Sequence, residues 1–147
     1  MIEIRNTIRM EDYAALRASV DWEEKSQRQM ETALKNSAYM AVAVDNGKVV
    51  GFTRTYGDGA LIMLIGDVMV RPEYQGQGIG RMLVNNVLDY IQSISSEEEP
   101  ILVYLMSNVG KEEFYKKIGF TERPNHETGA GMFRWVPKRP SNWNRRL

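Results

Sequence analysis

A glycine-rich segment between an apolar run and an amphipathic stretch constrains this chain more than any other feature. Residues 75–80 read Gln-Gly-Gln-Gly-Ile-Gly and follow shortly after the apolar residues 68–70. Glycine lets backbone N–H groups approach a ligand closely, and the positive end of a following helix dipole attracts anions. The segment therefore predicts a strand–loop–helix unit that binds a phosphate-bearing ligand.

The flanking residues support this prediction. Apolar side chains recur at helical spacing from Ile79 to Ile94, and Asn86 is the one polar break in that stripe. Residues 61–70 predict a largely buried strand, and Pro72 then ends sheet pairing because it has no N–H to donate. Strand, turn, glycine loop and helix follow one another in the order that phosphate binding requires.

Two nucleotide-binding patterns fit the loop incompletely. A P-loop requires Lys and Ser or Thr after its last glycine, whereas Gly80 is followed by Arg81 and Met82. A dinucleotide fingerprint fits Gly76 and Gly78, but Arg81 stands where the third glycine belongs. A nucleotide-binding module stays open as an alternative, which binding of coenzyme A without binding of ATP or NAD would exclude.

A third pattern accounts for more of the chain. Gln75-x-x-Gly78-x-Gly80 resembles the acetyl-CoA-binding motif Q/R-x-x-G-x-G/A of the GNAT superfamily of N-acetyltransferases. Residues 114–120, Phe-Tyr-Lys-Lys-Ile-Gly-Phe, are similar to the F-Y-x-x-x-G-F segment of the same family and follow a strand-like run at 101–105. The resemblance covers residues 38–120, and the whole chain more loosely. It implies a single-domain mixed α/β fold, with a mostly antiparallel sheet that splays at the cofactor strand and helices on both faces.

The resemblance also implies an activity. In this family the cofactor is acetyl-CoA, and a primary amine of a small molecule or peptide attacks it directly. The sequence agrees, because it has no cysteine and no serine–histidine pairing to form an acyl-enzyme. A non-catalytic acyl-CoA-binding or regulatory module of the same fold is the alternative.

The resemblance assigns cofactor contacts to three parts of the chain. Main-chain groups at the end of the strand would polarise the thioester carbonyl, and N–H groups of the loop would hold the pyrophosphate. The expected contacts are Met69 and Val70 in the strand, Gln75, Gly76, Gln77, Gly78, Ile79, Gly80 and Arg81 in the loop, and Asn108 and Tyr115 downstream.

Two side chains are candidates for proton transfer. The resemblance places the Tyr115 hydroxyl near the cofactor sulfur, where it would protonate the departing thiolate; packing against Phe114 and Phe120 is the alternative role. The residue or water that acts as base stays open: Asp67, Glu73 and Asp58 are the nearby carboxylates, and Asp67 on the cofactor strand would accept the amine proton through water. Capping or pairing at a strand start is the equally weighted alternative for Asp67.

The amine acceptor is expected between the first two helices and the late strands. Trp22, Tyr56, Asp58 and residues 128–132 are candidate lining residues. An aromatic and acidic lining would suit a cationic amine, although the same residues could simply close the core.

Composition limits the partners. At 147 residues the chain predicts one domain, residues 1–147. Lys plus Arg and Asp plus Glu both number 19, so neither nucleic acid nor a membrane surface is expected as a partner. The absence of cysteine excludes thiolate zinc sites, and no metal is expected. The chain shows no signal-peptide pattern, so a cytoplasmic location is expected.

The basic tail at residues 138–147 is interpreted as a loosely ordered terminus; a dimer contact or a nucleic-acid patch is the alternative, and the short patch on a neutral domain argues against nucleic acid. The sequence leaves the oligomeric state open, with a homodimer through edge strands as the state that the resemblance suggests.

The apolar periodicity and turn residues predict the remaining elements. Asn46-Gly47 is a strong two-residue hairpin signal. The expected strands are residues 2–8, 39–45, 48–56, 61–70, 101–105 and 132–136, and the expected helices are residues 10–20, 23–36, 79–94 and 111–118.

Overall fold

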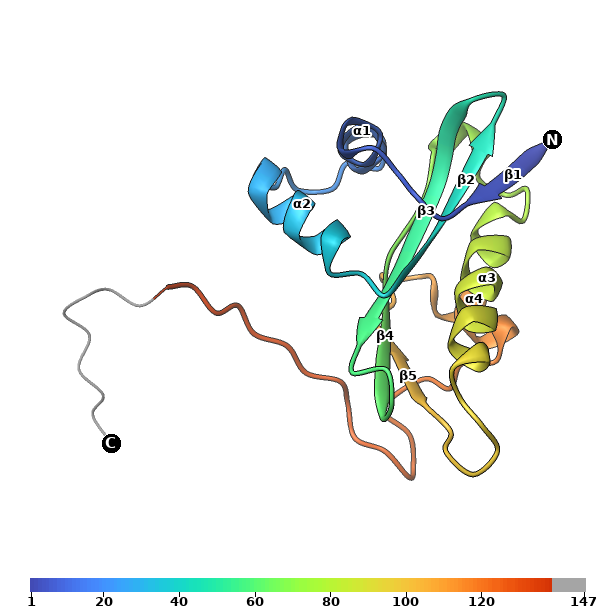
Figure 1. The fold of residues 1–147 in the computed structure, drawn as a ribbon. Coiled ribbons are helices and arrows are strands. Elements are labelled where there is room, and N and C mark those ends of the chain that lie inside the picture. Colours follow the sequence, from blue (N-terminus) through green and yellow to red (C-terminus); the bar gives the residue numbers. More distant parts are fainter. Residues whose placement is uncertain (139–147) are drawn as a thin grey trace. The chain divides into compact units, whose positions relative to one another are not determined.

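A five-stranded sheet organises the first part of the molecule. The computed structural model describes residues 1–138, in two units: Met1–Ser107 and a second that begins at Asn108. In the first unit the strand order is β1-β2-β3-β4-β5 (Figure 1), and all neighbours are antiparallel except the parallel pair β4–β5. Its elements are β1 (Ile2–Arg5), α1 (Met10–Ser19), α2 (Gln27–Lys35), β2 (Tyr39–Asp45), β3 (Lys48–Gly57), β4 (Ile62–Val70), the 3₁₀ turn η1 (Pro72–Tyr74), α3 (Ile79–Ser93) and β5 (Leu102–Leu105).

Local sequence explains the boundaries of two of these elements. Asn46 and Gly47 both have positive φ, +48° and +82°, as a two-residue hairpin turn requires, and β2 and β3 pair on either side of it. The second helix begins at Gln27 and not at residue 23 as expected, because Ser26 and Gln29 form a reciprocal capping box there. The expected first strand is also too long, since pairing with β2 ends at Arg5.

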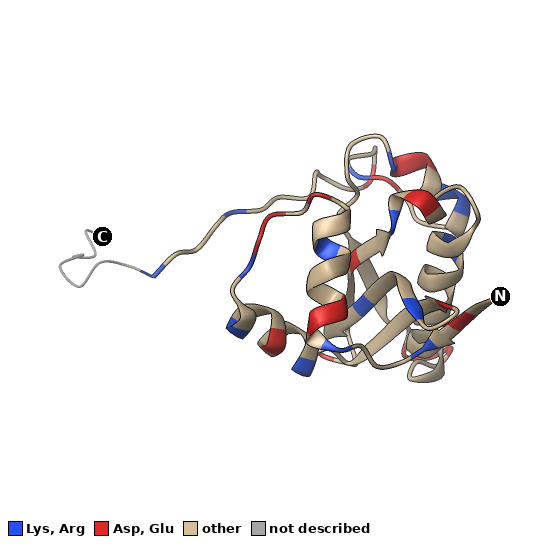
Figure 2. Ribbon diagram, turned by 90° about the horizontal axis from the view of Figure 1, so that it is seen from above, with Lys and Arg blue, Asp and Glu red and all other residues tan. Residues whose placement is uncertain are grey.

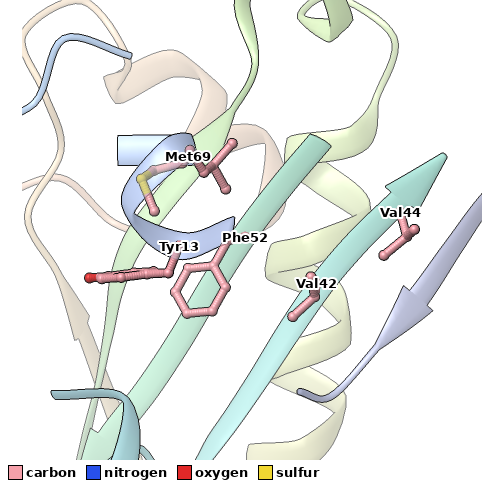
Figure 3. Packing of buried hydrophobic residues seen from close by; sticks show 6 residues of the cluster. Tyr13, Val42, Val44, Phe52 and Met69 are labelled. Atoms are coloured by element: carbon pink, nitrogen blue, oxygen red, sulfur yellow. The ribbon is translucent and has the colours of Figure 1, made fainter. Parts of the chain in front are cut away.

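One face of the sheet packs on α1 and α2. Figure 1 shows these two helices on one side of the sheet and α3 on the other. Tyr13 of α1 meets Phe52 of β3 edge to face, with ring centroids 5.2 Å apart. In Figure 3 the Tyr13 hydroxyl points away from Val42 and Val44. The fully buried residues of this face are Tyr13, Leu16, Val42, Val44, Phe52 and Met69.

The opposite face packs on α3. Gly51 of β3 lies under this helix, and a Cβ at Gly51 would come within 2.9 Å of Leu83 Cδ1 and 3.2 Å of Ile79 Cγ2. The expected polar break Asn86 has a partner, because its side-chain oxygen accepts a hydrogen bond from the Tyr39 hydroxyl at 2.8 Å. The residues of α3 that are buried are Ile79, Leu83, Val84, Val87 and Ile91, whereas Met82 and Ile94 of the expected apolar stripe are exposed.

The second unit contains one described helix, α4 (Glu112–Ile118), which Gly119 ends with φ +108°. The expected strand at residues 132–136 is wrong: these residues belong to no strand, and all of their large apolar side chains are exposed. A strand forms only where its backbone groups find a pairing partner, which apolar alternation alone cannot supply. Apart from Lys138, the basic tail lies outside the described residues, and the single-domain assignment for 1–147 stays a prediction.

Charges are interspersed on the ribbon. Figure 2 shows Lys and Arg segments alternating with Asp and Glu segments along the helices and strands. Within residues 1–138, none of the helices combines the length and the apolar character that crossing a bilayer would demand.

The expected fold class is confirmed: the sheet is mixed, mostly antiparallel, and carries helices on both faces.

Candidate active site

The strand β4 loses its neighbour halfway along its length. β5 pairs with β4 only from Ile62 to Ile65, while β4 continues to Val70. The register with β3 shifts at the same place, and Asp67 there has φ +56°. Such a bulge bends a strand and increases its twist. Beyond Ile65, one edge of β4 is therefore open among the described residues, which is the splay expected at the cofactor strand.

The hydrogen-bond pattern shows which main-chain groups face this open edge. Arg71 N donates to Val50 O at 2.8 Å, and Met69 is paired with Phe52 in the same register. Because bonded and non-bonded pairs alternate in an antiparallel ladder, Met69 directs its N–H toward β3 and Val70 directs its N–H to the open edge. Met69 directs its N–H into the sheet and buries its side chain. Val70 is therefore the better candidate of the two for a main-chain contact with a ligand.

The glycine loop joins the open edge of β4 to α3. Gln75 Nε2 donates to Val70 O at 2.9 Å, which ties the start of the loop to the strand end. Gly76 and Gly78 have φ +78° and +82°, and a Cβ on either would meet nothing within 4 Å. The backbone conformation requires glycine here, while the space in front of the loop is open.

Three consecutive amides of the loop are available to an anion. Gly78 is the N-cap of α3 and has no side-chain oxygen to cap the helix. The first intrahelical bond from Met82 N reaches Gly78 O, so the N–H groups of Ile79, Gly80 and Arg81 precede the helical ladder. The helix dipole adds positive potential at the same place. The loop has the features of a phosphate site.

Charged side chains around the loop are mostly neutralised or positive. Lys48 Nζ lies 3.0 Å from Glu73 Oε1. The pKa of Glu73 is lowered by a hydrogen bond from its own backbone N–H and then by the Lys48 ammonium. Arg71 Nε donates to Val49 O at 2.8 Å, while Arg81 is exposed. The loop thus presents no uncompensated carboxylate to an approaching anion among these residues.

Tyr115 and Asn108 lie in the second unit. Tyr115 on α4 contacts Phe114 and Phe120 edge to face, with ring centroids 4.9 Å and 6.1 Å apart. Burial raises the pKa of the Tyr115 hydroxyl, which keeps it protonated at neutral pH. Asn108 O accepts a hydrogen bond from Lys111 N at the start of α4. The aromatic packing and the raised pKa are both compatible with a proton-donating role.

Asp67 lies in a network that the sequence did not predict. Its Oδ2 accepts hydrogen bonds from the Tyr13 hydroxyl and from Arg54 Nε, both at 2.7 Å. Arg17 Nη1 is 4.0 Å from its other oxygen. The structure therefore shows the pairing role that was weighed for Asp67, at the bulge in the middle of β4 and not at a strand start. Its role as a base stays a prediction.

The sequence does not identify Tyr13, Arg17 or Arg54 as residues near the site. Arg54 left a signal, because it is the one charged residue in the interior of the expected strand 48–56. Tyr13 and Arg17 give no signal in the sequence, because polar and charged side chains are common along a helix that has an exposed face.

The expected acceptor-lining residues fall into two groups. Trp22 and Tyr56 join the Asp67 network: the Arg17 guanidinium lies 5.4 Å from the Trp22 ring, and that of Arg54 lies 4.6 Å from the Tyr56 ring. Asp58 instead stabilises the turn into β4, where its Oδ1 accepts three backbone N–H bonds, and these bonds lower its pKa. Residues 128–132 lie in the second unit and are exposed.

Comparison with known proteins accounts for these features together. Residues 36–122, more than half of the chain, match the acetyltransferase (GNAT) domain. The chain is 30% identical to the uncharacterized N-acetyltransferase ycf52 of Pyropia yezoensis over 124 residues, which are 82% of this chain and 67% of that protein.

Solved structures show the same fold. The GNAT family acetyltransferase SP0256 of Streptococcus pneumoniae matches with 30% identity and a TM-score of 0.78, covering 95% of this chain and all of that one. N-acetylglutamate synthase of Neisseria gonorrhoeae, solved with coenzyme A and N-acetyl-glutamate, shares the fold at 19% identity and a TM-score of 0.67, covering 82% of this chain and 28% of that one. The open edge of β4, the glycine loop at the start of α3 and these matches lead to one conclusion: the chain belongs to the GNAT superfamily of acetyltransferases.

Proposed function

We propose that this protein transfers the acetyl group of acetyl-CoA to a primary amine by direct attack, without an acyl-enzyme. The observation that carries the proposal is the open edge of β4, which leads through Val70 into the left-handed glycine loop. Acetyl-CoA supplies an activated acetyl group: the amine nitrogen adds to its carbonyl carbon, and the C–S bond then breaks to release the thiolate of coenzyme A.

The main chain would do most of the binding. N–H groups of residues 75–81 would hold the pyrophosphate, where the helix dipole attracts negative charge. The Val70 N–H, directed to the open edge, would donate to the carbonyl oxygen as negative charge develops on it. The edge beside Val68 and Val70 would pair with the amide groups of the cofactor arm, in the manner of an added strand.

Two protons have to move. We assign Tyr115 as the acid that protonates the leaving thiolate, because its hydroxyl carries a proton at neutral pH and the resemblance to the family places it near the cofactor sulfur. Asp67 remains the proposed acceptor of the amine proton through water. Its contacts with Tyr13 and Arg54 give it a second role, in holding α1 to the bulge.

The loop assignment is tested with two glycine variants. Gly78→Val and Gly59→Val each force a β-branched residue into a left-handed conformation, φ +82° and +74°, with nothing within 4 Å of the new Cβ. Strain should therefore be similar in both. Isothermal calorimetry should show acetyl-CoA affinity falling at least roughly tenfold in Gly78→Val only, because the added groups block close backbone approach. Equal affinity in both variants would contradict the assignment.

The acid assignment is tested with Tyr115→Phe, which keeps the ring and removes the proton. We expect kcat to fall about 100-fold or more with acetyl-CoA binding retained. Tyr90→Phe is the control, since its ring stacks on Tyr39 at 4.5 Å in the first unit. Unchanged turnover in Tyr115→Phe would show that the Tyr115 hydroxyl is not the acid that protonates the thiolate.

A cytoplasmic location and a homodimer complete the proposal. Size-exclusion chromatography with light scattering measures the dimer directly, and a monomeric mass at micromolar concentration would contradict it.

A further inference from the structure

We propose that the amine acceptor carries an anionic group, a carboxylate or a phosphate, and that Arg17 and Arg54 bind it. The inference rests on the proposed acetyl transfer and names the substrate class of that same site. It is carried by a set of side chains on the α1 face of β4, which we call the arginine cluster: Tyr13, Arg17, Trp22, Arg54, Tyr56 and Asp67.

The cluster has an excess of positive charge. Two guanidinium groups face one carboxylate, with Arg54 Nε 2.7 Å and Arg17 Nη1 4.0 Å from Asp67. Glu23 is the other acid near Arg17, but its carboxylate lies 2.8 Å from Lys25 Nζ. The side chains of Arg17, Arg54 and Asp67 are only 13%, 16% and 16% exposed, so water screens the remaining charge weakly. An anion would complete the charge balance.

The arginines are held in place before any ligand arrives. Arg17 Nη2 donates to Glu23 O at 3.0 Å, and Arg54 Nη1 reaches Ala33 O at 3.4 Å. Each guanidinium also lies over an aromatic ring, Trp22 for Arg17 and Tyr56 for Arg54. A fork fixed in this way loses little entropy when it binds a carboxylate or phosphate.

Donors of the cluster remain unused. A guanidinium has five N–H groups, and Arg17 Nε is buried without an acceptor among the described residues. A buried donor of this kind is costly and calls for a partner.

The rings that would attract a cation are already occupied on one face. Trp22 and Tyr56 were expected to attract a cationic amine, but each carries an arginine of this chain. A second cation at the same ring would meet like charge. The cluster therefore favours an anion over a further positive group.

The cluster lies within reach of the proposed reaction centre. Asp67 precedes Val70 by three residues of β4, and an extended strand rises about 3.3 Å per residue, so the bulge at Asp67 leaves the two Cα atoms at most about 10 Å apart. A small amine with an anionic group several bonds from its nitrogen could span this separation.

Matched acceptors test the inference on the unaltered protein. ω-Amino acids of increasing chain length are compared with their carboxamides, and amino alcohols of matching length with their phosphate monoesters, which separates carboxylate from phosphate recognition. Thiol release and mass detection of the acetylated product give kcat/KM, and calorimetry with coenzyme A present gives acceptor binding. We expect the anionic member of at least one set to be preferred roughly 10- to 100-fold, the range that charged hydrogen bonds provide.

Arg17→Gln then tests the assignment to the cluster. The variant should lose most of this preference, because kcat/KM should fall more for the anionic acceptor than for its uncharged partner, while acetyl-CoA affinity stays within twofold. Arg17→Lys, which keeps the charge without the fork, should restore part of it. Arg9→Gln is the control, because Arg9 stands just before the same helix, is 75% exposed and pairs with Asp12. Melting temperatures and acetyl-CoA binding verify that each variant is folded.

The outcomes separate the two proposals. Two results would overturn the inference and leave the proposed acetyl transfer standing. In the first, uncharged or cationic amines are acetylated as efficiently as anionic ones; in the second, Arg17→Gln retains the preference for the anionic acceptor. The inference would also be overturned if the protein bound acetyl-CoA but neither bound nor acetylated any anionic acceptor. If acetyl-CoA neither binds nor turns over with any amine, the proposed function itself fails.

Discussion

The two faces of the sheet in Met1–Ser107 are built by different means. On the α3 face, small residues of the strands let the helix approach closely, as at Gly51 under Leu83 and Ile79. On the α1 face, aromatic residues pack over β2 and β3, and charged side chains meet where β4 bulges at Asp67. Close packing stabilises the α3 face, whereas packing together with ion pairs and hydrogen bonds stabilises the α1 face.

This difference separates two tasks. The α3 side carries the glycine loop, where main-chain amides serve any ligand with the right anionic group. The α1 side presents side chains, which can be varied residue by residue without disturbing the loop. We expect cofactor binding to follow the first region and acceptor choice to follow the second.

The largest effect is expected on the charged face. Asp67→Asn removes the carboxylate without backbone cost, because asparagine tolerates φ +56°. It leaves two largely buried guanidinium groups without a counter-charge, so the free energy of unfolding should fall by about 3 kcal/mol in urea titration. Asp12→Asn, at an exposed pair with Arg9, is the control and should cost less than about 1 kcal/mol. Equal losses would mean that charge does not hold the α1 face.

A matched pair of glycines compares the two faces directly. Gly51→Ala puts a Cβ 2.9 Å from Leu83 Cδ1 and 3.1 Å from the Met69 carbonyl oxygen, which should cost about 2 kcal/mol through overpacking. In Gly66→Ala the nearest atoms to the new Cβ belong to the Tyr56 side chain, at 3.2 Å and beyond, and this partly exposed ring can move. We expect the smaller loss for Gly66→Ala in thermal unfolding. The reverse order would show that the α1 face is the tighter one.

A buried hydroxyl gives a smaller effect. Thr53 is fully buried, and its hydroxyl donates to Gly66 O at 2.9 Å beside the bulge. Thr53→Val keeps the shape and removes this bond, so about 1 kcal/mol should be lost in chemical denaturation. Thr32→Val, on the exposed side of α2, is the reference. If Thr53→Val lowers the free energy of unfolding no more than Thr32→Val does, the Thr53 hydrogen bond does not support the bulge.

The smallest effect concerns pH and appears only in alkali. Burial, and then the hydrogen bond to Asp67, raises the pKa of the Tyr13 hydroxyl. A group whose pKa is raised on folding stabilises the fold fully below its unfolded pKa, about 10 for tyrosine, and this stabilisation is lost as pH rises through the folded pKa. The free energy of unfolding should therefore fall less steeply above pH 10 in Tyr13→Phe than in the unaltered protein. Tyr74 and Tyr115 also have raised pKa values, so part of the fall should persist in the variant. Identical slopes would contradict the assignment to Tyr13.

The elements that were predicted correctly are those with strong local signals. The hairpin at Asn46-Gly47 and the helix that starts at Ile79 follow from residues close together in the sequence. The start of α2 was placed four residues too early, although Ser26 and Gln29 carry a capping box that could have located it. The expected strand at residues 132–136 failed because alternation does not show whether a strand has a partner.

The glycine loop and the helix that follows it can be predicted from the sequence alone, because left-handed turns and helical periodicity depend on neighbouring residues. Folding brings Tyr13 and Asp67, 54 residues apart, into one hydrogen bond and places Arg17 and Arg54 beside it, which no local pattern predicts. The reason is physical: a bulge in β4 and the packing of α1 select these contacts, and both depend on the register of the whole sheet.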